Sequence, residues 1–292
     1  MPRVENLVFF TEGAFSNRDY TRFGVAHLQE EGFRVEAWDL SRVLHPDAVP
    51  PDQLPAALPG GFTPRQFTGK GEVLHAIGEM RPGTLVNCFV GYSVSSLFIY
   101  RALSKRRIPY AVTATNALPA PERITRTLTP DLPKKALSRL VQTTILRLYP
   151  LFGVQPAFLC LAGGDRSLAS LSYPVDIKGG RTTLLPVHTL DYDLYLESRG
   201  PEPPALENFA VFLDGNDFHH QDLRFMKEPV PGWMDEYFSQ LRGFFDVLER
   251  ELDTRIVIAA HPEARYTPEQ KAQFGEREVV QGRTADLVRR CR

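Results

Sequence analysis

The sequence predicts an α/β protein of two Rossmann-like domains, the second of them incomplete. Three observations lead to this prediction. Short apolar runs of a length suited to buried parallel strands recur along the chain, and helix-like stretches separate several of them. A proline-rich segment interrupts this alternation, which then restarts. The length of 292 residues agrees with two domains, because a typical domain has about 150 residues.

The first domain is expected over residues 1–200. Its helix-like stretches include Asp19–Glu31, which Gly32 is expected to end, and Ser93–Lys105, which directly follows an expected strand. The apolar runs expected to form its parallel strands are Leu7–Phe10, Val35–Leu40, Leu85–Val90, Tyr110–Thr113 and Phe158–Leu161. Strands that alternate with helices in this way predict a doubly wound parallel sheet.

Residues 201–208, within the segment GPEPPALEN, are expected to link the two domains. Beyond them, strand-like runs and helix-like stretches alternate again. These are the strands Phe209–Leu213, Arg255–Ala259 and Val279–Val280 and the helices Met234–Glu251 and Thr284–Arg290. The second domain, 209–292, therefore has about half the length that a complete Rossmann-like half requires, and we expect it to be incomplete.

Composition excludes several classes of protein. Lysine and arginine total 34 against 35 aspartate and glutamate residues, which excludes a nucleic-acid-binding protein held by bulk positive charge. The cysteines Cys88, Cys160 and Cys291 form no CxxC pair, which argues against a disulfide scaffold or a structural zinc site. We expect no signal peptide, because Glu5 and Asn6 interrupt the early apolar run, and no apolar window is long enough to span a membrane. A cytoplasmic protein is therefore expected.

The loops that follow the expected strands supply the candidate site residues, because ligands bind at the carboxyl ends of strands in doubly wound sheets. Glu12 follows the first strand, where it can act as a base or serve as a turn residue. His261 follows a buried strand and precedes Pro262, and its ring can donate to a phosphate. Gly282 and Thr284 lie at a strand-to-helix turn, which can cap the helix or bind a phosphate.

Two further segments leave alternatives open. The stretch Gly91–Ser95 is similar to a nucleophile elbow but has Ser95 where that motif has its second glycine, and Ser93 or Ser95 can equally cap the following helix. Residues 132–152 predict a basic amphipathic helix. Such a helix either lies on an anionic membrane surface or packs against the core with a solvated face.

Five stretches resemble a family of bacterial glycosyltransferases encoded in surface-polysaccharide (capsule or O-antigen) gene clusters. The resemblance covers essentially the whole chain and is most specific from Leu184 onward. The stretches are ENLVFFTEGAFSNRDYTRFGVAHLQEEGFRVEAWDLS (Glu5–Ser41), LLPVHTLDYDLYLESR (Leu184–Arg199), FAVFLDGNDFHHQD (Phe209–Asp222), RIVIAAHPEARY (Arg255–Tyr266) and FGEREVVQGRTADLV (Phe274–Val288).

This resemblance implies a GT-B architecture, in which two Rossmann-like domains face each other. The acceptor then binds mainly to the first domain and the nucleotide sugar mainly to the second. It also implies a glycan acceptor on a lipid carrier, and with it peripheral contact of residues 132–152 with the inner membrane. We expect no bound metal or cofactor, with the nucleotide sugar as co-substrate, because helix N-termini and basic side chains typically offset the charge of the leaving diphosphate.

The expected glycosyltransferase function gives roles to particular residues, of which the role of His261 is implied by the resemblance. His261 is expected to meet the donor phosphate, and Glu12 is the candidate general base of an inverting mechanism, with Asp19 as a further catalytic candidate. The residues expected to bind the donor are Asp214, Asp217, His261, Pro262, Gly282 and Thr284.

The chain departs from the family at two points. It has Glu263 where the family has a basic residue after the His-Pro pair, and the family continues beyond the last helix with another strand, a loop and a helical region. Two other functions therefore stay open: transfer of glycerophosphate or another phosphoalcohol from a CDP-linked donor, and non-catalytic binding of a glycan or partner protein by a truncated chain. A serine hydrolase built on Ser93 is a third.

Overall fold

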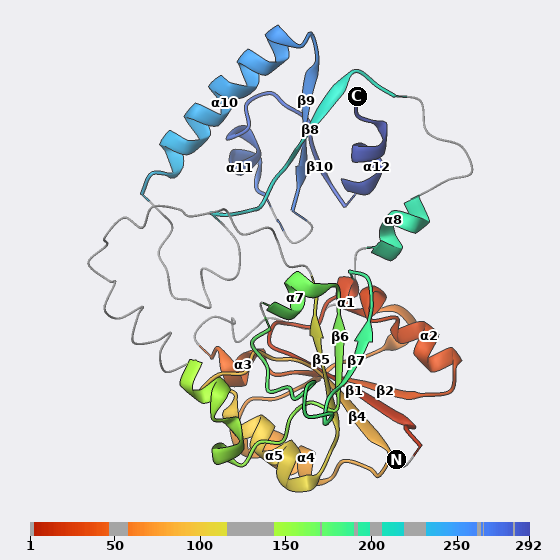
Figure 1. The fold of residues 1–292 in the computed structure, drawn as a ribbon. Coiled ribbons are helices and arrows are strands. Elements are labelled where there is room, and N and C mark those ends of the chain that lie inside the picture. Colours follow the sequence, from red (N-terminus) through yellow and green to blue (C-terminus); the bar gives the residue numbers. More distant parts are fainter. Residues whose placement is uncertain are drawn as a thin grey trace. The chain divides into compact units, whose positions relative to one another are not determined.

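The chain divides into two compact units, Met1–Leu190 and Asp191–Arg292 (Figure 1). The computed structural model describes residues 3–46, 58–115, 143–169, 171–189, 192–198, 206–218, 232–261, 264, 266–282 and 284–292. The sequence places the end of the first domain at residue 200, whereas helix α8 (Tyr192–Ser198) belongs to the second unit, where it contacts α12 (Thr284–Arg290). Of the expected linker, only residues 206–208 are described.

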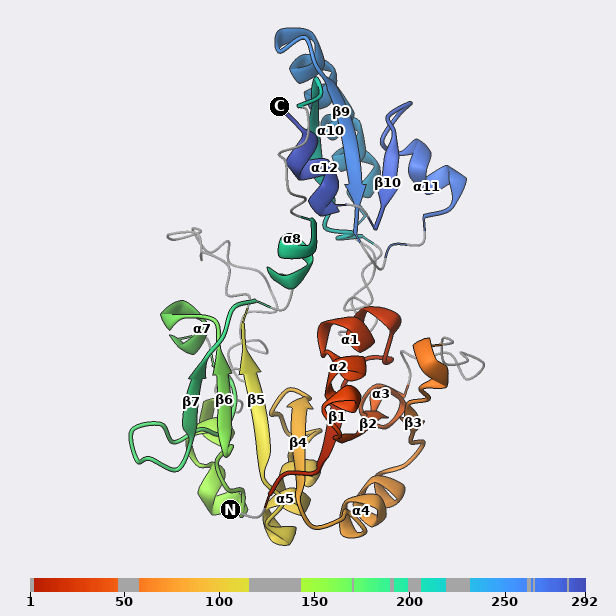
Figure 2. The same cartoon turned by 90° about the vertical axis from the view of Figure 1, so that its right-hand side faces the viewer.

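The first unit is built on a parallel sheet of seven strands in the order β3-β2-β1-β4-β5-β6-β7 (Figure 2). The strands are β1 (Asn6–Thr11), β2 (Arg34–Asp39), β3 (Arg65–Gln66), β4 (Thr84–Phe89), β5 (Tyr110–Ala114), β6 (Leu159–Ala162) and β7 (Thr183–Pro186). The chain runs from β1 outward to β3 and then returns to β4 on the other side of β1. The α/β prediction is confirmed, and the strand order reverses between β1 and β4.

Both faces of this sheet are covered, as alternation along the strands requires. Val86 and Cys88 of β4 lie in the larger core, together with buried side chains of α4 (Lys70–Gly78) and α5 (Leu97–Arg106). On the opposite face, Phe9 and Phe89 stack against Phe23, with ring centroids 5.0 and 4.3 Å apart. Layers on two sides leave the carboxyl edge of the strands as the place where polar loops gather.

The expected helix Asp19–Glu31 is two helices, α1 (Asn17–Arg22) and α2 (Val25–Glu30). The break lies at Gly24, which adopts the left-handed conformation with φ of 62°. Apolar spacing alone does not reveal this break, because Phe23 remains on the apolar side and packs into the core. The unit also contains α3 (Ser41–Leu44), α7 (Asp165–Ala169) and the 3-10 turns η1 (Pro59–Gly61) and η2 (Tyr149–Phe152).

Part of the expected basic helix 132–152 lies outside the described residues, which begin again at 143. Residues 143–147 are helical, and η2 follows them. Ile145 is buried in the larger core of the first unit, whereas Leu148 and Leu151 are 42% and 81% exposed. The described part therefore packs one side against the core and leaves apolar side chains outside.

The second unit has a parallel sheet of three strands in the order β10-β9-β8. Alternate residues of β9 face two cores: Ile256 and Ile258 pack with the phenylalanines of α10, and Val257 and Ala259 pack with Leu287 of α12. Its elements besides α8 are β8 (Phe209–Leu213), α10 (Met234–Glu251), β9 (Arg255–Ala260), α11 (Pro268–Ala272), β10 (Val279–Gln281) and α12. The sequence predicts the three strands of this unit and the helices α10 and α12, but neither α8 nor α11.

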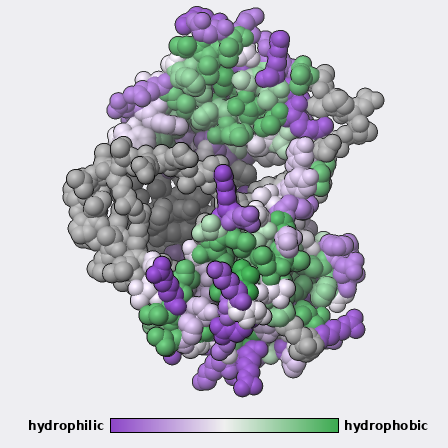
Figure 3. Space-filling model, viewed as in Figure 1, coloured by the Kyte–Doolittle hydropathy of each residue, from purple (hydrophilic) through white to green (hydrophobic). Residues whose placement is uncertain are grey.

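The surface of the second unit is markedly apolar in places. Figure 3 shows hydrophobic residues gathered over the middle of this unit and hydrophilic residues around them. Its described large hydrophobic side chains that are more than half exposed are Leu206, Leu213, Trp233, Phe244 and Leu252. No helix among the described residues has the length and apolar character needed to cross a membrane.

The break at Gly24 can be tested by substitution. Gly24→Ala is expected to lower the free energy of unfolding by about 1–2 kcal/mol, because a side chain is strained at positive φ. Gly71→Ala is the matched control: Gly71 lies within α4, where an added Cβ meets nothing within 4 Å, and the substitution should stabilise by about 0.5–1 kcal/mol. Urea unfolding measures both, and an equal effect of the two substitutions would contradict this account.

Candidate functional site

The polar cluster of the first unit lies where the strand order reverses. Glu12 directly follows β1, and the turn Gly91–Ser96 follows β4, the neighbour of β1 in the sheet. Thr11, the last residue of β1, pairs with Phe89, the last residue of β4, so both strands end at the same level of the sheet. Crevices at the carboxyl ends of strands on either side of such a reversal are the usual ligand sites of doubly wound sheets.

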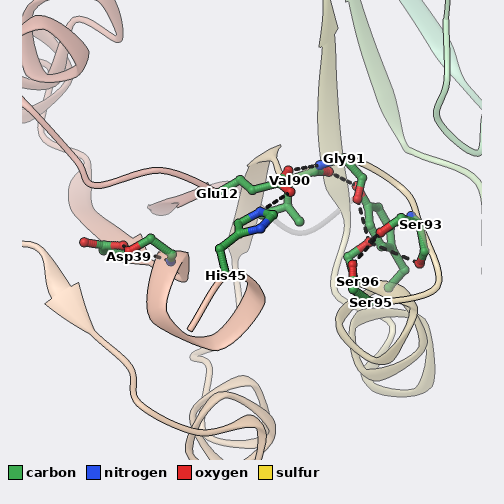
Figure 4. A network of polar contacts seen from close by, with 10 residues as sticks. Glu12, Asp39, His45, Val90, Gly91, Ser93, Ser95 and Ser96 are labelled. Carbon is green, nitrogen blue, oxygen red and sulfur yellow. Dashed lines mark hydrogen bonds and ion pairs between the residues drawn. The ribbon is translucent and has the colours of Figure 1, made fainter. Parts of the chain in front are cut away.

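The Glu12 carboxylate holds this cluster together (Figure 4). Its Oε1 lies 2.8 Å from Nε2 of His45, and its Oε2 accepts a hydrogen bond of 2.9 Å from the backbone N–H of Gly91. His45 comes from the segment after β2 and α3. One side chain therefore joins the carboxyl ends of three adjacent strands, β2, β1 and β4.

The Glu12–His45 pair has the chemistry of an acid–base unit. A carboxylate against one ring nitrogen orients an imidazole, and a proton can pass between the two groups. The two side chains are 36% and 20% exposed, so they are enclosed and still reachable. The arrangement can take a proton from a hydroxyl group that binds beside it.

Asp39 supports the position of His45. Its Oδ1 accepts hydrogen bonds from the backbone N–H and the hydroxyl group of Ser41, at 3.0 and 2.5 Å, at the first residue of α3. Gln66 of the neighbouring strand β3 donates to its Oδ2 at 3.4 Å. Because α3 leads directly into His45, this buried carboxylate fixes the segment that carries the imidazole.

Asp19 has a structural partner. Its carboxylate accepts hydrogen bonds from the backbone N–H and hydroxyl group of Ser16, at 2.9 and 2.8 Å, and Ser16 in turn accepts from the N–H of Asp19. This is a capping box at the start of α1. The contacts explain Asp19 as a helix cap, and its catalytic role stays a prediction.

The turn after β4 differs from either interpretation of the sequence. Ser96, not Ser93 or Ser95, stands at the N-cap position of α5, and its side chain makes no capping hydrogen bond. The buried Ser96 hydroxyl group donates to the carbonyl oxygen of Gly91 at 2.5 Å and accepts from the N–H of Ser93 at 2.9 Å. The Ser93 and Ser95 hydroxyl groups lie 2.8 Å apart.

Beneath this turn, the nearest thiol is not available for catalysis. Burial raises the pKa of Cys88 to about 11, and its Sγ lies 3.4 Å from the hydroxyl oxygen of Tyr100. Burial also raises the pKa of Tyr100 well above its ordinary value. Both groups therefore stay protonated at neutral pH and serve the core.

In the second unit, Asp214 ties two strand ends together. It follows β8, and its carboxylate accepts hydrogen bonds from the N–H of Asn216 at 3.1 Å, from Tyr266 at 2.5 Å and more weakly from the N–H of His261 at 3.4 Å. Burial and this hydrogen bond raise the pKa of Tyr266, which keeps it a donor. The structure thus brings Asp214 and the backbone of His261 together, and their role in donor binding stays a prediction.

The other predicted donor residues lie around the same edge. Asp217 is in the loop after Asp214, with its carboxylate against Gly215. Gly282 follows β10 with φ of 78°, and Thr284 begins α12. Gln281, at the end of β10, donates to the carbonyl oxygen of Ala264. Pro262, together with Glu263, lies outside the described residues.

Among the described residues, no three His, Cys, Asp or Glu side chains lie close enough together to hold a metal ion.

Sequence reasoning missed His45, although His45 precedes Pro46 just as His261 precedes Pro262, and although it follows an expected strand. That repeated His-Pro pair was the available signal.

The chain is similar to known proteins in structure and not in sequence. No family model matches the chain, and no curated protein matches it. Among solved structures, it is similar to the UDP-N-acetylglucosamine 2-epimerase of Rickettsia bellii, with 10% identity and a TM-score of 0.37 over 99% of this chain and 68% of the other. It is also similar to MurG of Acinetobacter baumannii, with 11% identity and a TM-score of 0.42 over 98% and 71%.

The hydrogen bond between Tyr266 and Asp214 is expected to stabilise the folded protein. Tyr266→Phe should lower the free energy of unfolding by about 1–2 kcal/mol, because it removes the hydroxyl donor from a partly buried carboxylate. Tyr195→Phe, at a 45% exposed tyrosine of α8, should change it little. Denaturant unfolding followed by circular dichroism gives both free energies of unfolding. Equal decreases in the two variants would contradict a stabilising hydrogen bond from the Tyr266 hydroxyl group.

Proposed function

We propose that the protein is a glycosyltransferase that moves a sugar from a nucleotide-sugar donor to a hydroxyl group of a glycan acceptor. The observation that carries the proposal is the Glu12–His45 pair at the strand-order reversal of the first unit. The sequence resemblance agrees with it, and the second unit offers a separate polar edge for the donor around Asp214 and His261.

The pair supplies the proton transfer that glycosyl transfer requires. The acceptor hydroxyl group gives its proton to the pair, and the acceptor oxygen forms a bond to the anomeric carbon. The bond from that carbon to the diphosphate oxygen breaks, and its electron pair leaves on the diphosphate. Attack from the side opposite the leaving group inverts the anomeric centre. Glu12 is the proposed base, with His45 holding its carboxylate and sharing the proton.

The donor is assigned to the second unit. His261, at the end of β9, is proposed to meet the donor diphosphate, and Pro262, Gly282 and Thr284 remain the other proposed donor-binding residues. Asp214 already accepts three hydrogen bonds, so we assign it to holding this edge in place. Apart from the nucleotide-sugar co-substrate, the proposal requires no cofactor.

The finer assignment follows from the resemblance. We propose that the acceptor belongs to a bacterial surface polysaccharide and is carried on a lipid at the cytoplasmic side of the inner membrane. The exposed Leu148 and Leu151, beside Arg147, are consistent with contact between the region 132–152 and such a surface.

A donor screen tests the function directly. Binding of UDP-, GDP- and CDP-linked sugars and of CDP-glycerol is measured by saturation-transfer NMR, and turnover by release of the nucleotide. We expect one nucleotide sugar to bind and turn over. Turnover of CDP-glycerol alone would favour phosphoalcohol transfer, and glycan binding without nucleotide binding would favour a non-catalytic role.

The base is tested in the same assay. Glu12→Gln should lower kcat by about 10²- to 10⁴-fold and leave donor binding unchanged, because it removes the proton acceptor. Asp19→Asn tests the second candidate in parallel: because the Asp19 carboxylate caps α1, we expect this variant to keep near-normal kcat. Loss of activity in Asp19→Asn with normal activity in Glu12→Gln would reverse the assignment.

Membrane contact is tested with vesicles of phosphatidylglycerol. The protein should sediment with them at low salt and be released at high salt, because salt screens the attraction of basic residues. Leu151→Asp should weaken the binding, whereas Leu74→Asp, at an exposed leucine of α4, should not. Failure to sediment at low salt would refute the contact.

A further inference from the structure

We propose that Ser96 is a positioning residue for the Glu12–His45 pair, and that it acts through the peptide groups of Gly91. The inference rests on the proposed function, because it gives the buried serine a task in the same site. Neither the strand-to-helix position of Ser96 nor its residue type indicates this role in the sequence.

A chain of contacts connects Ser96 to the pair (Figure 4). The Ser96 hydroxyl group donates to the carbonyl oxygen of Gly91, and the N–H of Gly91 donates to Oε2 of Glu12. The other oxygen of Glu12 lies against His45. The three contacts in this chain are 2.5, 2.9 and 2.8 Å long, which is within the normal range of hydrogen bonds.

The contacts of Ser96 are those of a turn clamp and not those of a helix cap. A serine at the N-cap position normally accepts from an N–H of the first helical turn. Here the hydroxyl group instead accepts from the N–H of Ser93 and donates back to Gly91, so it closes the turn between β4 and α5 from inside. Ser96 is 1% exposed, which keeps water from replacing it.

The backbone of this turn approaches the Glu12 carboxylate closely. A Cβ on Gly91 would lie 3.4 Å from Oε2 of Glu12, so the Gly91 backbone already stands in contact with the carboxylate. Removing the Ser96 hydroxyl group leaves the Gly91 carbonyl and the Ser93 N–H without their partner, and the turn is expected to relax. A misplacement of about 1 Å at a catalytic group can cost about 100-fold in rate.

The test compares Ser96→Ala with Ser95→Ala. Ser95 is the matched control, because it is exposed and its hydroxyl group contacts the hydroxyl group of Ser93 and not the peptide groups of Gly91. The first measurement is amide hydrogen exchange at Gly91, followed by NMR on the full chain, which requires no substrate. We expect exchange at Gly91 to become at least tenfold faster in Ser96→Ala and to stay unchanged in Ser95→Ala.

The second measurement is kinetic. Ser96→Ala should lower kcat by about 10- to 100-fold with little change in the KM of the donor, since donor binding is assigned to the other unit. Ser96→Cys keeps a weaker donor on a larger sulfur atom, and its kcat should lie between those of the unaltered protein and Ser96→Ala. If Ser96→Ala does not fold, Ser96→Cys decides the question by the same two readouts.

The outcomes separate the two proposals. Faster exchange at Gly91 in Ser96→Ala, together with no glycosyl transfer by the unaltered protein, would support the contact of Ser96 with the turn and refute the proposed function. Unchanged exchange and unchanged kcat in Ser96→Ala, or equal effects in Ser95→Ala, would overturn the positioning role even if the protein is a glycosyltransferase.

Discussion

The site of the first unit depends on one carboxylate. Glu12 accepts from the Gly91 N–H with one oxygen and contacts the His45 ring with the other, and so connects the ends of three strands that the chain reaches at distant points. Asp214 does the same in the second unit, where it connects the ends of β8 and β9. In both units an acidic residue directly after the first strand organises the carboxyl edge of a parallel sheet.

Much of the fold could be predicted from the sequence. The strands and α10 of the second unit follow closely, because these strands are continuous apolar runs and α10 is a long amphipathic helix. The short strands β3 and β7 were missed, since two to four residues give too little pattern. The helix Asp19–Glu31 was wrong because a left-handed glycine, which leaves the apolar spacing intact, divides it.

The site was predictable only in part. Glu12, Asp214 and His261 follow strands directly, and the position at a carboxyl edge reveals them. His45 and Ser96 lie further from their strands, and their importance comes from contacts with residues 33 positions away and, through Gly91, 79 positions away. Local sequence does not encode such pairings. They become visible only when the sheet sets β1 beside both β2 and β4.

The most direct test of the central claim is a double-mutant cycle on Glu12 and His45. Glycosyl transfer is measured for Glu12→Gln, His45→Ala and the double variant. Because two residues that act as one unit are non-additive, the account predicts that the double variant loses little more activity than the more impaired single variant. Losses that multiply, with each residue contributing independently, would contradict the claim that the two side chains form one acid–base unit.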